Sequence, residues 1–427
     1  MSSICIRGGY CLNGEVDIQG AKNAALPIMA ASLLNKGIVC LRRCPQISDV
    51  RHMCRLLEQM GVRIETDGDR LILDTKEIDP IEISAPDAGK MRSSVLLLGP
   101  LMGRKTEVLM PYPGGCTIGA RPVNWHIEAL QKMNVQVSMR EEGIYCRTKG
   151  IKGAKIVLSY PSVGVTENVI LAAVLAEGST EIINAAMEPE IEDLCRFLIA
   201  AGARINGIGT NRIVITGVEQ LHDVQYTIMA DRIVAGTYMT AVAAAGGQAV
   251  LKGVRVRHVQ SVADVLAESG CGLIIYKESI KIIAPSMLLA VKEIETEPYP
   301  GFPTDMQSQM LACLCQARGD STVTEHIFEN RYKVVPELIR MGGNITVDQR
   351  RAVIHGPCRM HGEKVEAKEL RGGAALVIAG LAAEGETVIH GSEHIERGYQ
   401  DICKDLGQLG AEICCITDHT ERRWEDN

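Results

Sequence analysis

The chain has 427 residues, of which 46% are hydrophobic and 23% are charged, and its formal net charge is -7. This length exceeds what one ordinary hydrophobic core holds, so it predicts two or three domains. The mildly acidic balance argues against a general nucleic-acid binder, which would carry a basic patch or stripe. It leaves room for a local cluster of arginines that receives an anionic small molecule.

The N-terminal residues, MSSICIRGGYCLNGEV, contain no apolar stretch typical of secretion signals, so we expect no signal peptide and a cytoplasmic protein. The longest charge-free run, 233–251, is broken by Gly, Thr and Gln, which favours a buried helix packed through small residues over a membrane span. The fifteen cysteines include no CxxC pair, which gives little support for zinc or iron–sulfur ligation. We therefore expect no metal, no cofactor and mostly reduced cysteines in the core.

Six amphipathic helical segments recur along the chain, and each ends at a turn residue before an apolar stretch typical of a strand. The turn residues are separated by 73, 68, 68, 72 and 68 positions. They are Gly61, Asn134, Gly202, Gly270, Gly342 and Gly410. A second helix in each repeat is rich in small residues, as in RGGAALVIAGLAAEG, and the low aromatic content lets such helices approach closely at the centre. The pattern predicts an α/β unit of two helices and roughly four strands, repeated six times.

The last repeat stops without the strand hairpin that the complete repeats carry, and the first 21 residues resemble the missing half. We therefore predict a first lobe of residues 22–229, with repeats one to three. The second lobe is expected to consist of 1–21 plus 230–427, with repeats four to six closed by the N-terminal strands. The chain would then cross twice between lobes, which favours a hinge-closing enzyme.

Cations stand where three of the small-residue helices begin, at Lys22, Arg92 and Arg371. A cation at this end opposes the helix dipole, and an anionic ligand would relieve the conflict. Asp231 and Asp305 occupy the same place in two other helices, and there a carboxylate can also serve as a helix cap. For Asp231 the cap and the functional interpretation stay equally open.

Arginines also precede the amphipathic helices. Arg121 and Arg397 occupy the same position relative to their turn residues, and Arg331 lies close to that position in its own repeat. The planar guanidinium group suits bidentate contact with carboxylate or phosphate. We therefore predict a cleft between the lobes for a substrate rich in phosphate and carboxylate. The first lobe would contribute Lys22, Arg92, Cys116 and Arg121, and the second Asp305, Arg331, Arg371 and Arg397.

Eight segments in order resemble one family over essentially the whole chain: GAKNAALPIMAA, KMRSSVLLLGPL, PGGCTIGARPV, PSVGVTENV, EPEIEDL, FPTDMQSQ, FENRY and RGYQDI. The family is that of the UDP-N-acetylglucosamine 1-carboxyvinyltransferases. The resemblance implies an inside-out α/β barrel of two lobes, each with three repeats. It also implies transfer of the enolpyruvyl group of phosphoenolpyruvate to the 3′-hydroxyl of UDP-N-acetylglucosamine with release of phosphate, the first committed step of peptidoglycan synthesis.

The resemblance also implies roles for individual residues. Asp305 matches the carboxylate at the sugar hydroxyl, and Cys116 matches a loop thiol that acts as general acid and is alkylated by fosfomycin. The residues that match those gripping phosphoenolpyruvate are Lys22, Arg92, Arg121 and Arg397, of which Lys22 and Arg397 join Cys116 and Asp305 as catalytic. Those that match residues orienting sugar or intermediate are Asn23, Arg331 and Arg371. The other implied substrate contacts are Pro122, Val123, Ser162, Val163, Gly164 and Ile327.

Four residues depart from the family pattern. Glu369 stands where Asp is usual, Asn124 and Trp125 stand near the expected nucleotide in place of an Asp and a smaller residue, and Tyr160 stands where Lys, Arg or Phe is often seen. Two alternatives therefore stay open. One is the sister enolpyruvyl transferase of the shikimate pathway, which lacks the cysteine. The other is a non-catalytic paralogue that binds a UDP-sugar.

Overall fold

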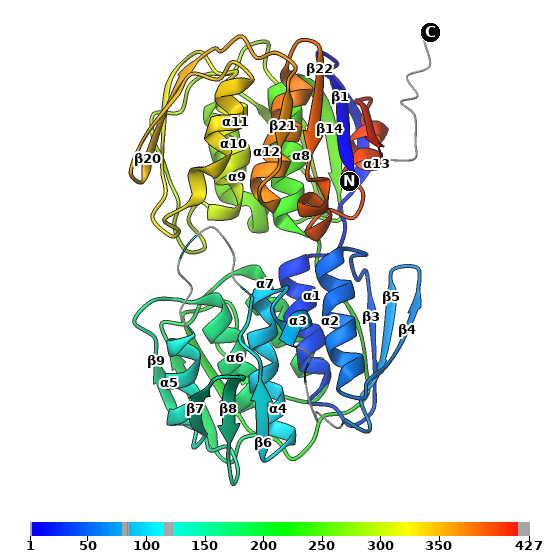
Figure 1. Cartoon of the computed structure of the whole chain (residues 1–427), viewed down its shortest axis with the longest axis vertical. Coiled ribbons are helices and arrows are strands. Elements are labelled where there is room, and N and C mark those ends of the chain that lie inside the picture. Colours follow the sequence, from blue (N-terminus) through cyan, green and yellow to red (C-terminus); the bar gives the residue numbers. More distant parts are fainter. Residues whose placement is uncertain (1, 79–82, 84, 115–118, 120–122, 417–427) are drawn as a thin grey trace. The chain divides into compact units, whose positions relative to one another are not determined.

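The computed structural model describes residues 2–78, 83, 85–114, 119 and 123–416 (Figure 1). The chain forms two compact units. The N-terminal unit consists of residues 20–116 and 121–229, and the C-terminal unit consists of residues 1–19, 117–120 and 230–427. The action of the two units as closing lobes stays a prediction.

The six amphipathic helices form as predicted. They are α2 (Ser48–Gln59), α5 (Asn124–Lys132), α7 (Pro189–Ala200), α9 (Val256–Glu268), α11 (Val335–Arg340) and α13 (Ile402–Gln408). All six predicted turn residues have positive φ, from 67° at Asn134 to 106° at Gly202. This left-handed conformation just past a helix end costs glycine little, and asparagine tolerates it better than most residues. The turn residues, and with them the sixfold repeat, are confirmed.

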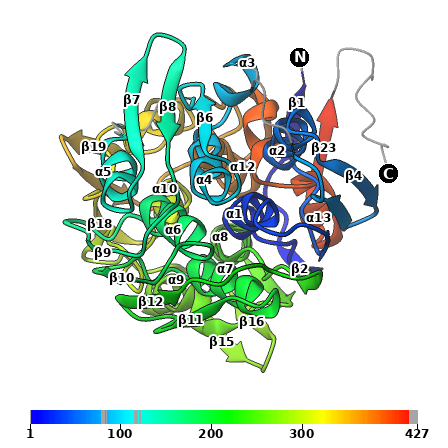
Figure 2. The ribbon, with the colours of Figure 1, turned by 90° about the horizontal axis from the view of Figure 1, so that it is seen from below.

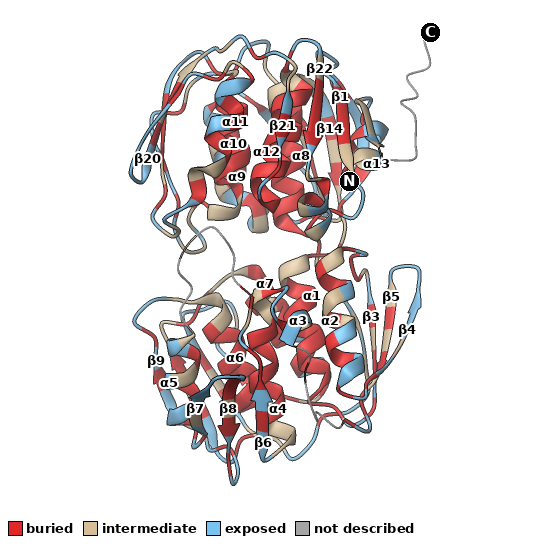
Figure 3. Ribbon diagram, in the orientation of Figure 1, coloured by how far each residue is buried: buried red, intermediate tan, exposed pale blue. Residues whose placement is uncertain are grey.

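The small-residue helices are the most buried elements of each unit, as Figure 3 shows for α1, α4 and α6 and for α8, α10 and α12. Their bounds are α1 (Lys22–Ser32), α4 (Leu98–Arg104), α6 (Val163–Ala173), α8 (Arg232–Ala245), α10 (Gln307–Leu314) and α12 (Leu370–Ala382). In the C-terminal unit α8, α10 and α12 contact one another, and in the N-terminal unit α4 packs against α6. The predicted central position of these helices is confirmed.

Two of these segments differ in detail from the prediction. The second segment begins as a 3-10 helix, η1 (Arg92–Leu97), because Pro100 cannot donate the helical hydrogen bond to Leu96 and disfavours regular α-helix before it. The charge-free run 233–251 is helical only to Ala245, and its remainder lies in strand β14 (Gly247–Lys252). Gly246 lies between the two elements, and both it and Gly247, the first residue of β14, have positive φ. In the described part of the chain, no helix has the length and apolar character of a membrane span.

The N-terminal unit holds three sheets, with the strand orders β13-β3-β5-β4, β6-β8-β7 and β11-β12-β10-β9. The strands are β3 (Ile38–Arg42), β4 (Arg63–Asp67), β5 (Arg70–Asp74), β6 (Glu107–Met110), β7 (Gln136–Arg140), β8 (Gly143–Arg147), β9 (Lys155–Val157), β10 (Ser179–Ile183), β11 (Arg204–Asn206), β12 (Arg212–Thr216) and β13 (Val224–Thr227). A short helix, α3 (Ala85–Ala88), precedes η1. Figure 2 shows the β7–β8 hairpin at the rim of this unit.

The C-terminal unit holds three further sheets, with the orders β15-β16-β14-β2, β17-β18-β20-β19 and β21-β22-β1-β23. Besides β14, the strands are β1 (Ser3–Arg7), β2 (Leu12–Asp17), β15 (Gly272–Ile275), β16 (Ser279–Ile283), β17 (Ile294–Glu295), β18 (Gly319–Thr324), β19 (Ile345–Asp348), β20 (Arg351–Gly356), β21 (Lys364–Glu366), β22 (Glu386–His390) and β23 (Glu412–Ile416). The 3-10 helices are η2 (Thr304–Met306), η3 (Arg331–Val334) and η4 (Ser392–Arg397).

Strands from the two ends of each unit pair and join its three repeats into a closed series. In the N-terminal unit β13 pairs in parallel with β3. In the C-terminal unit β1 lies antiparallel between β22 and β23, and β2 pairs in parallel with β14. The N-terminal strands thus take the place of the hairpin strand that the sixth repeat lacks. The predicted α/β class is confirmed.

Candidate active site

The predicted site residues fall in different parts of the structure. Cys116, Arg121 and Pro122 lie outside the described residues. The others belong either to the N-terminal or to the C-terminal unit.

In the N-terminal unit Lys22, the first residue of α1, forms an ion pair with Asp49 in the first turn of α2. The distance from Lys22 Nζ to Asp49 Oδ2 is 2.6 Å. The Lys22 side chain is 12% exposed and that of Asp49 only 4%, so the cation is the more accessible partner. The buried carboxylate offsets the unfavourable position of Lys22 at a helix start. The next residue, Asn23, is half-buried.

Arg92 begins η1 and lies within electrostatic reach of His126 in α5. Burial, reinforced by the charge of Arg92, lowers the pKa of His126 to about 4. His126 Nδ1 lies 3.0 Å from Nδ2 of Asn168 in α6. A Cβ atom at Gly164, in the first turn of α6, would lie 3.4 Å from Cε1 of the same imidazole. Arg92 and Gly164 are therefore both near the buried, neutral His126.

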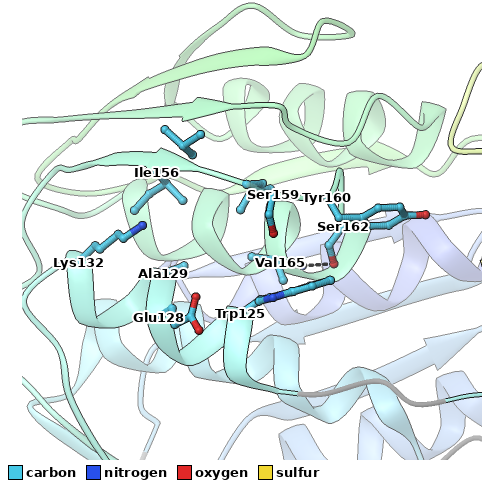
Figure 4. Close-up of a pocket in the computed structure, with 11 residues that line it drawn as sticks. Trp125, Glu128, Ala129, Lys132, Ile156, Ser159, Tyr160, Ser162 and Val165 are labelled. Carbon is cyan, nitrogen blue, oxygen red and sulfur yellow. Dashed lines mark hydrogen bonds between the residues drawn. The ribbon is translucent and has the colours of Figure 1, made fainter.

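The start of α6 borders a pocket of this unit (Figure 4). Ser162 caps α6 by accepting a hydrogen bond of 3.5 Å from the Val165 amide, and Val163 follows as the first helical residue. Opposite, Val123 immediately precedes α5 and is half-buried. Trp125 and Tyr160 stack with ring centroids 6.2 Å apart and an interplanar angle of 26°. The remaining lining residues include Glu128, Lys132, Ile156 and Ser159.

In the C-terminal unit Asp305, in η2 just before α10, binds two arginines. Its Oδ1 lies 2.5 Å from Arg331 Nη2, and its Oδ2 lies 2.7 Å from Arg371 Nη2. The Arg331 and Arg371 side chains are 2% and 4% exposed, whereas that of Asp305 is 26% exposed. Charge-assisted hydrogen bonds to both oxygens stabilise the ionised carboxylate and fix its orientation.

Arg371 joins Asp305 to a buried polar network. Burial alone would lower the pKa of Arg371, but the negative charges of Asp305 and Asp231, Asp305 above all, raise it above the ordinary arginine value. The Tyr399 hydroxyl is 2.7 Å from Thr237 Oγ1, and Gln309 Nε2 donates to Thr237 Oγ1 at 3.2 Å. Gln309 Nε2 also donates to the Asp305 carbonyl at 2.8 Å, so α8, α10 and α12 all contribute to the position of Asp305.

Asp231 is the N-cap of α8, because its Oδ1 accepts hydrogen bonds from the Ile233 and Val234 amides at 2.8 and 3.0 Å. Of its two open interpretations, the structure therefore supports the helix cap. Glu369 caps α12 in the same way, accepting from the Gly372 amide and, at 2.8 Å, from the Arg371 amide. The Glu369 carboxylate also lies 4.0 Å from Arg331 Nη1. Glu369, which stands where the family usually has Asp, is therefore a helix cap.

Ile327 and Arg397 complete the predicted set in this unit. The Ile327 amide donates at 2.9 Å to Glu325, whose carboxylate also accepts from Thr304 Oγ1 at 2.9 Å. This bond ties the Ile327 segment to the residue that precedes Asp305. Arg397 is the last residue of η4, is half-buried, and lies two positions before Tyr399.

Sequence reasoning missed several polar residues that hold the predicted ones in place: Asp49, Thr237, Gln309, Glu325 and Tyr399. A signal existed for two of them, because Gln309 lies one helical turn after Asp305 and Tyr399 lies in the RGYQDI segment. Chemically, Asp305 can accept a hydrogen bond or a proton from a hydroxyl, and Lys22 can bind an anion.

Comparisons with known proteins agree on one family. Residues 6–406 match the profile of EPSP synthase (3-phosphoshikimate 1-carboxyvinyltransferase). The chain is 47% identical over 416 residues to "UDP-N-acetylglucosamine 1-carboxyvinyltransferase 2" of Caldanaerobacter subterraneus subsp. tengcongensis, covering 97% of this chain and 100% of the relative. It is 45% identical to "UDP-N-acetylglucosamine 1-carboxyvinyltransferase" of Thermodesulfovibrio yellowstonii, covering 97% and 99%.

Solved structures show the same fold. The enolpyruvyl transferase NikO from Streptomyces tendae superposes with a TM-score of 0.87 at 23% identity, covering 97% of this chain and 98% of the other. An EPSP synthase from Acinetobacter baumannii superposes with a TM-score of 0.75 at 21% identity, covering 97% and 99%. At such identities the likeness concerns the fold alone, which is that of the enolpyruvyl transferases.

Proposed function

The chain belongs to the EPSP synthase family and, within it, to the UDP-N-acetylglucosamine 1-carboxyvinyltransferases, and from this premise we propose how its own residues carry out the transfer. The reaction moves the enolpyruvyl group of phosphoenolpyruvate to UDP-N-acetylglucosamine and releases phosphate, in peptidoglycan synthesis. The shikimate-pathway alternative is set aside, since the relatives at 45–47% identity carry the UDP-sugar name. We place the reaction in the cytoplasm.

Asp305 is the base that takes the proton from the sugar 3′-hydroxyl in this proposal. The observation that carries it is the accessible carboxylate held from two sides by the buried Arg331 and Arg371. This fixed orientation lets one oxygen face a hydroxyl without rearrangement, which is what a positioned general base requires. Arg331 and Arg371 then act as positioning residues, and they balance the charge of the ionised carboxylate.

Lys22, Arg92, Arg121 and Arg397 are proposed to hold the phosphate and carboxylate of phosphoenolpyruvate. Lys22 supports this role because its own counter-ion, Asp49, is the more buried partner of the pair. Cations that bind these groups also stabilise the negative charge that develops when phosphate leaves. Cys116, outside the described residues, is proposed as the acid that protonates the vinyl carbon.

The pocket beside Trp125 and Tyr160 is proposed to receive the uracil ring. Trp125 belongs to the segment expected near the nucleotide, and Ser162, the cap at the edge of the pocket, is an implied substrate contact. Two stacked aromatic rings offer a flat apolar surface, on which a base can pack. The aromatic departures at these two positions would therefore change how the base is held while leaving the reacting groups untouched.

Phosphate release tests the proposal. The purified protein is incubated with phosphoenolpyruvate and either UDP-N-acetylglucosamine or shikimate 3-phosphate, while calorimetry measures UDP-N-acetylglucosamine binding. We expect release with the UDP-sugar alone. Binding without release would support the non-catalytic paralogue and overturn the enzymatic proposal.

A further inference from the structure

The cysteines are the feature of this chain that the enzymatic function leaves unexplained. Seven of the fourteen described cysteines are buried, five are half-buried and two are exposed. The half-buried Cys54, Cys358 and Cys403 pack against the hydrophobic cores, so most of the described cysteines belong to the core or border it, as expected. Two of the described cysteines lie at neighbouring points of the C-terminal unit. Cys315 is the C-cap of α10 and is fully buried, and Cys358 lies two residues after the end of β20 and is half-buried.

The backbones at Cys315 and Cys358 are held together directly. The Cys358 amide donates a hydrogen bond of 2.7 Å to the Cys315 carbonyl. The two sulfurs lie beside adjacent residues of one segment: a Cβ atom at Gly343 would lie 3.5 Å from Cys315 Sγ, and the Asn344 amide lies 3.2 Å from Cys358 Sγ. Backbones joined in this way keep Cα atoms at separations comparable to the roughly 4.4–6.8 Å that disulfides span. A covalent S–S bond can therefore form here without a large rearrangement of the chain.

The surroundings of Cys358 favour its thiolate. The Asn344 amide donates to Cys358 Sγ at 3.2 Å. The hydrogen bond from Cys315, helped by the Asn344 amide and opposed by partial burial, lowers the pKa of Cys358 to about 6. In the thiol form Cys358 can instead donate to the His355 carbonyl at 3.4 Å. The same hydrogen bond and burial raise the pKa of Cys315, so Cys358 is the nucleophile and Cys315 its protonated neighbour.

We propose that Cys315 and Cys358 form an oxidation site at which a hydroperoxide converts the two thiols to a disulfide. The Cys358 thiolate attacks the peroxide, so that an S–O bond forms, the O–O bond breaks and hydroxide leaves to take up a solvent proton. The Cys315 thiol then displaces water from the sulfenic acid, which forms the S–S bond. Two thiols and one hydrogen peroxide give one disulfide and two waters, so the balance closes.

The test uses the reduced full-length protein, treated with hydrogen peroxide, blocked with N-ethylmaleimide and digested with trypsin without reduction. Cleavage after lysine and arginine places Cys358 in peptide 352–359 and both Cys313 and Cys315 in peptide 293–318. We expect these two peptides to appear linked, and to separate again when dithiothreitol is added before blocking.

Matched variants assign the bond. Cys313→Ala and Cys315→Ala remove neighbouring, equally buried sulfurs at the same helix end, and Cys358→Ser removes the half-buried partner. The linked peptides should persist in Cys313→Ala and disappear in Cys315→Ala and in Cys358→Ser. Linkage that persists in Cys315→Ala would overturn the proposal. So would oxidation of Cys358 to sulfinic acid in the unaltered protein without any linked peptide.

Discussion

The ion pairs at the start of α1 and at the start of α12 use the same charges in opposite arrangements. At α1 the cation Lys22 is the more accessible partner and Asp49 lies behind it at 4% exposure. At α12 the carboxylate Asp305 is the accessible partner, and Arg331 and Arg371 lie behind it at 2% and 4% exposure. In both places the buried partner fixes the direction of the accessible one.

The difference shows how one repeated helix start can serve two kinds of chemistry. A helix N-terminus favours anions, so Lys22 and Arg371 are each unfavourable there unless a carboxylate compensates. The N-terminal unit compensates with a buried carboxylate and leaves the cation as the more accessible partner, which suits the proposed binding of an anion. The C-terminal unit compensates with an accessible carboxylate oriented by two buried guanidinium groups, which suits the proposed role of Asp305 as base. Substitutions that alter one of the two arrangements at a time separate these roles.

The largest effect is expected for Asp305→Asn, which removes the accessible charge of the C-terminal arrangement. An amide cannot accept the hydroxyl proton, so turnover should fall by roughly 10²- to 10⁴-fold, the usual contribution of a positioned base. Phosphate release at saturating substrates measures the loss. Asp320→Asn, which changes an exposed carboxylate of the same unit, is the control and should leave turnover unchanged. Near-normal turnover of Asp305→Asn would contradict the role of Asp305 as base.

Lys22→Met breaks the N-terminal arrangement by removing its accessible cation while keeping the side-chain length. Loss of one charge-assisted hydrogen bond to phosphoenolpyruvate should raise KM for that substrate roughly 10- to 100-fold. Lys22→Arg should recover part of the loss. Lys90→Met, at an exposed ion pair with Asp87, is the control. An unchanged KM in Lys22→Met would show that Lys22 serves only to pair with Asp49.

Cys116→Asp leaves both ion-pair arrangements unchanged and alters only the proposed proton donor. A carboxylic acid can still donate a proton, so we expect part of the turnover to remain while sensitivity to fosfomycin disappears, since the soft nucleophile is gone. Residual phosphate release with and without fosfomycin, together with mass spectrometry of the adduct, measures both effects. Alkylation that continues in this variant would show that fosfomycin reacts with another thiol. Cys11→Ser, at an exposed cysteine, is the first control for such a second target.

The repeat could be predicted from sequence because its signals are local. A glycine at the left-handed position past a helix, as at Gly202, marks the turn by its own conformational freedom, and the apolar spacing before it marks the helix. The break of the second helix at Pro100 carried a local signal as well, since proline cannot donate the helical bond.

The partners within the site could not be predicted, because they depend on which distant segments pack together. Asp305 meets Arg331 and Arg371 across 26 and 66 positions, and nothing between them fixes that contact in advance. The sequence pattern identified the cations at the helix starts. From it we predicted that an anionic ligand offsets their unfavourable interaction with the helix dipole. The structure shows that Asp49 and Asp305 already supply much of it.

Trp125→Ala changes a surface outside both ion pairs and should therefore affect binding more than chemistry. Loss of base stacking costs about 1–3 kcal/mol, so KM for UDP-N-acetylglucosamine should rise roughly 5- to 150-fold with turnover at saturation unchanged. Trp125→Phe should restore most of the affinity, because an aromatic face remains. If turnover falls and KM stays constant, the uracil ring does not pack on this side chain.

Glu369→Asp is expected to have the smallest effect. Comparing it with Glu369→Ala shows whether the Glu369 carboxylate stabilises the protein as a helix cap or through Arg331. Glu369 accepts two amide hydrogen bonds at the start of α12 but lies 4.0 Å from Arg331. Asp is a good N-cap, so the free energy of unfolding should change by less than about 0.5 kcal/mol, whereas loss of the cap in Glu369→Ala should cost about 0.5–2 kcal/mol. Thermal unfolding compares the two. Equal destabilisation by both would mean that the longer reach of Glu369 toward Arg331, rather than the helix cap, stabilises the arrangement.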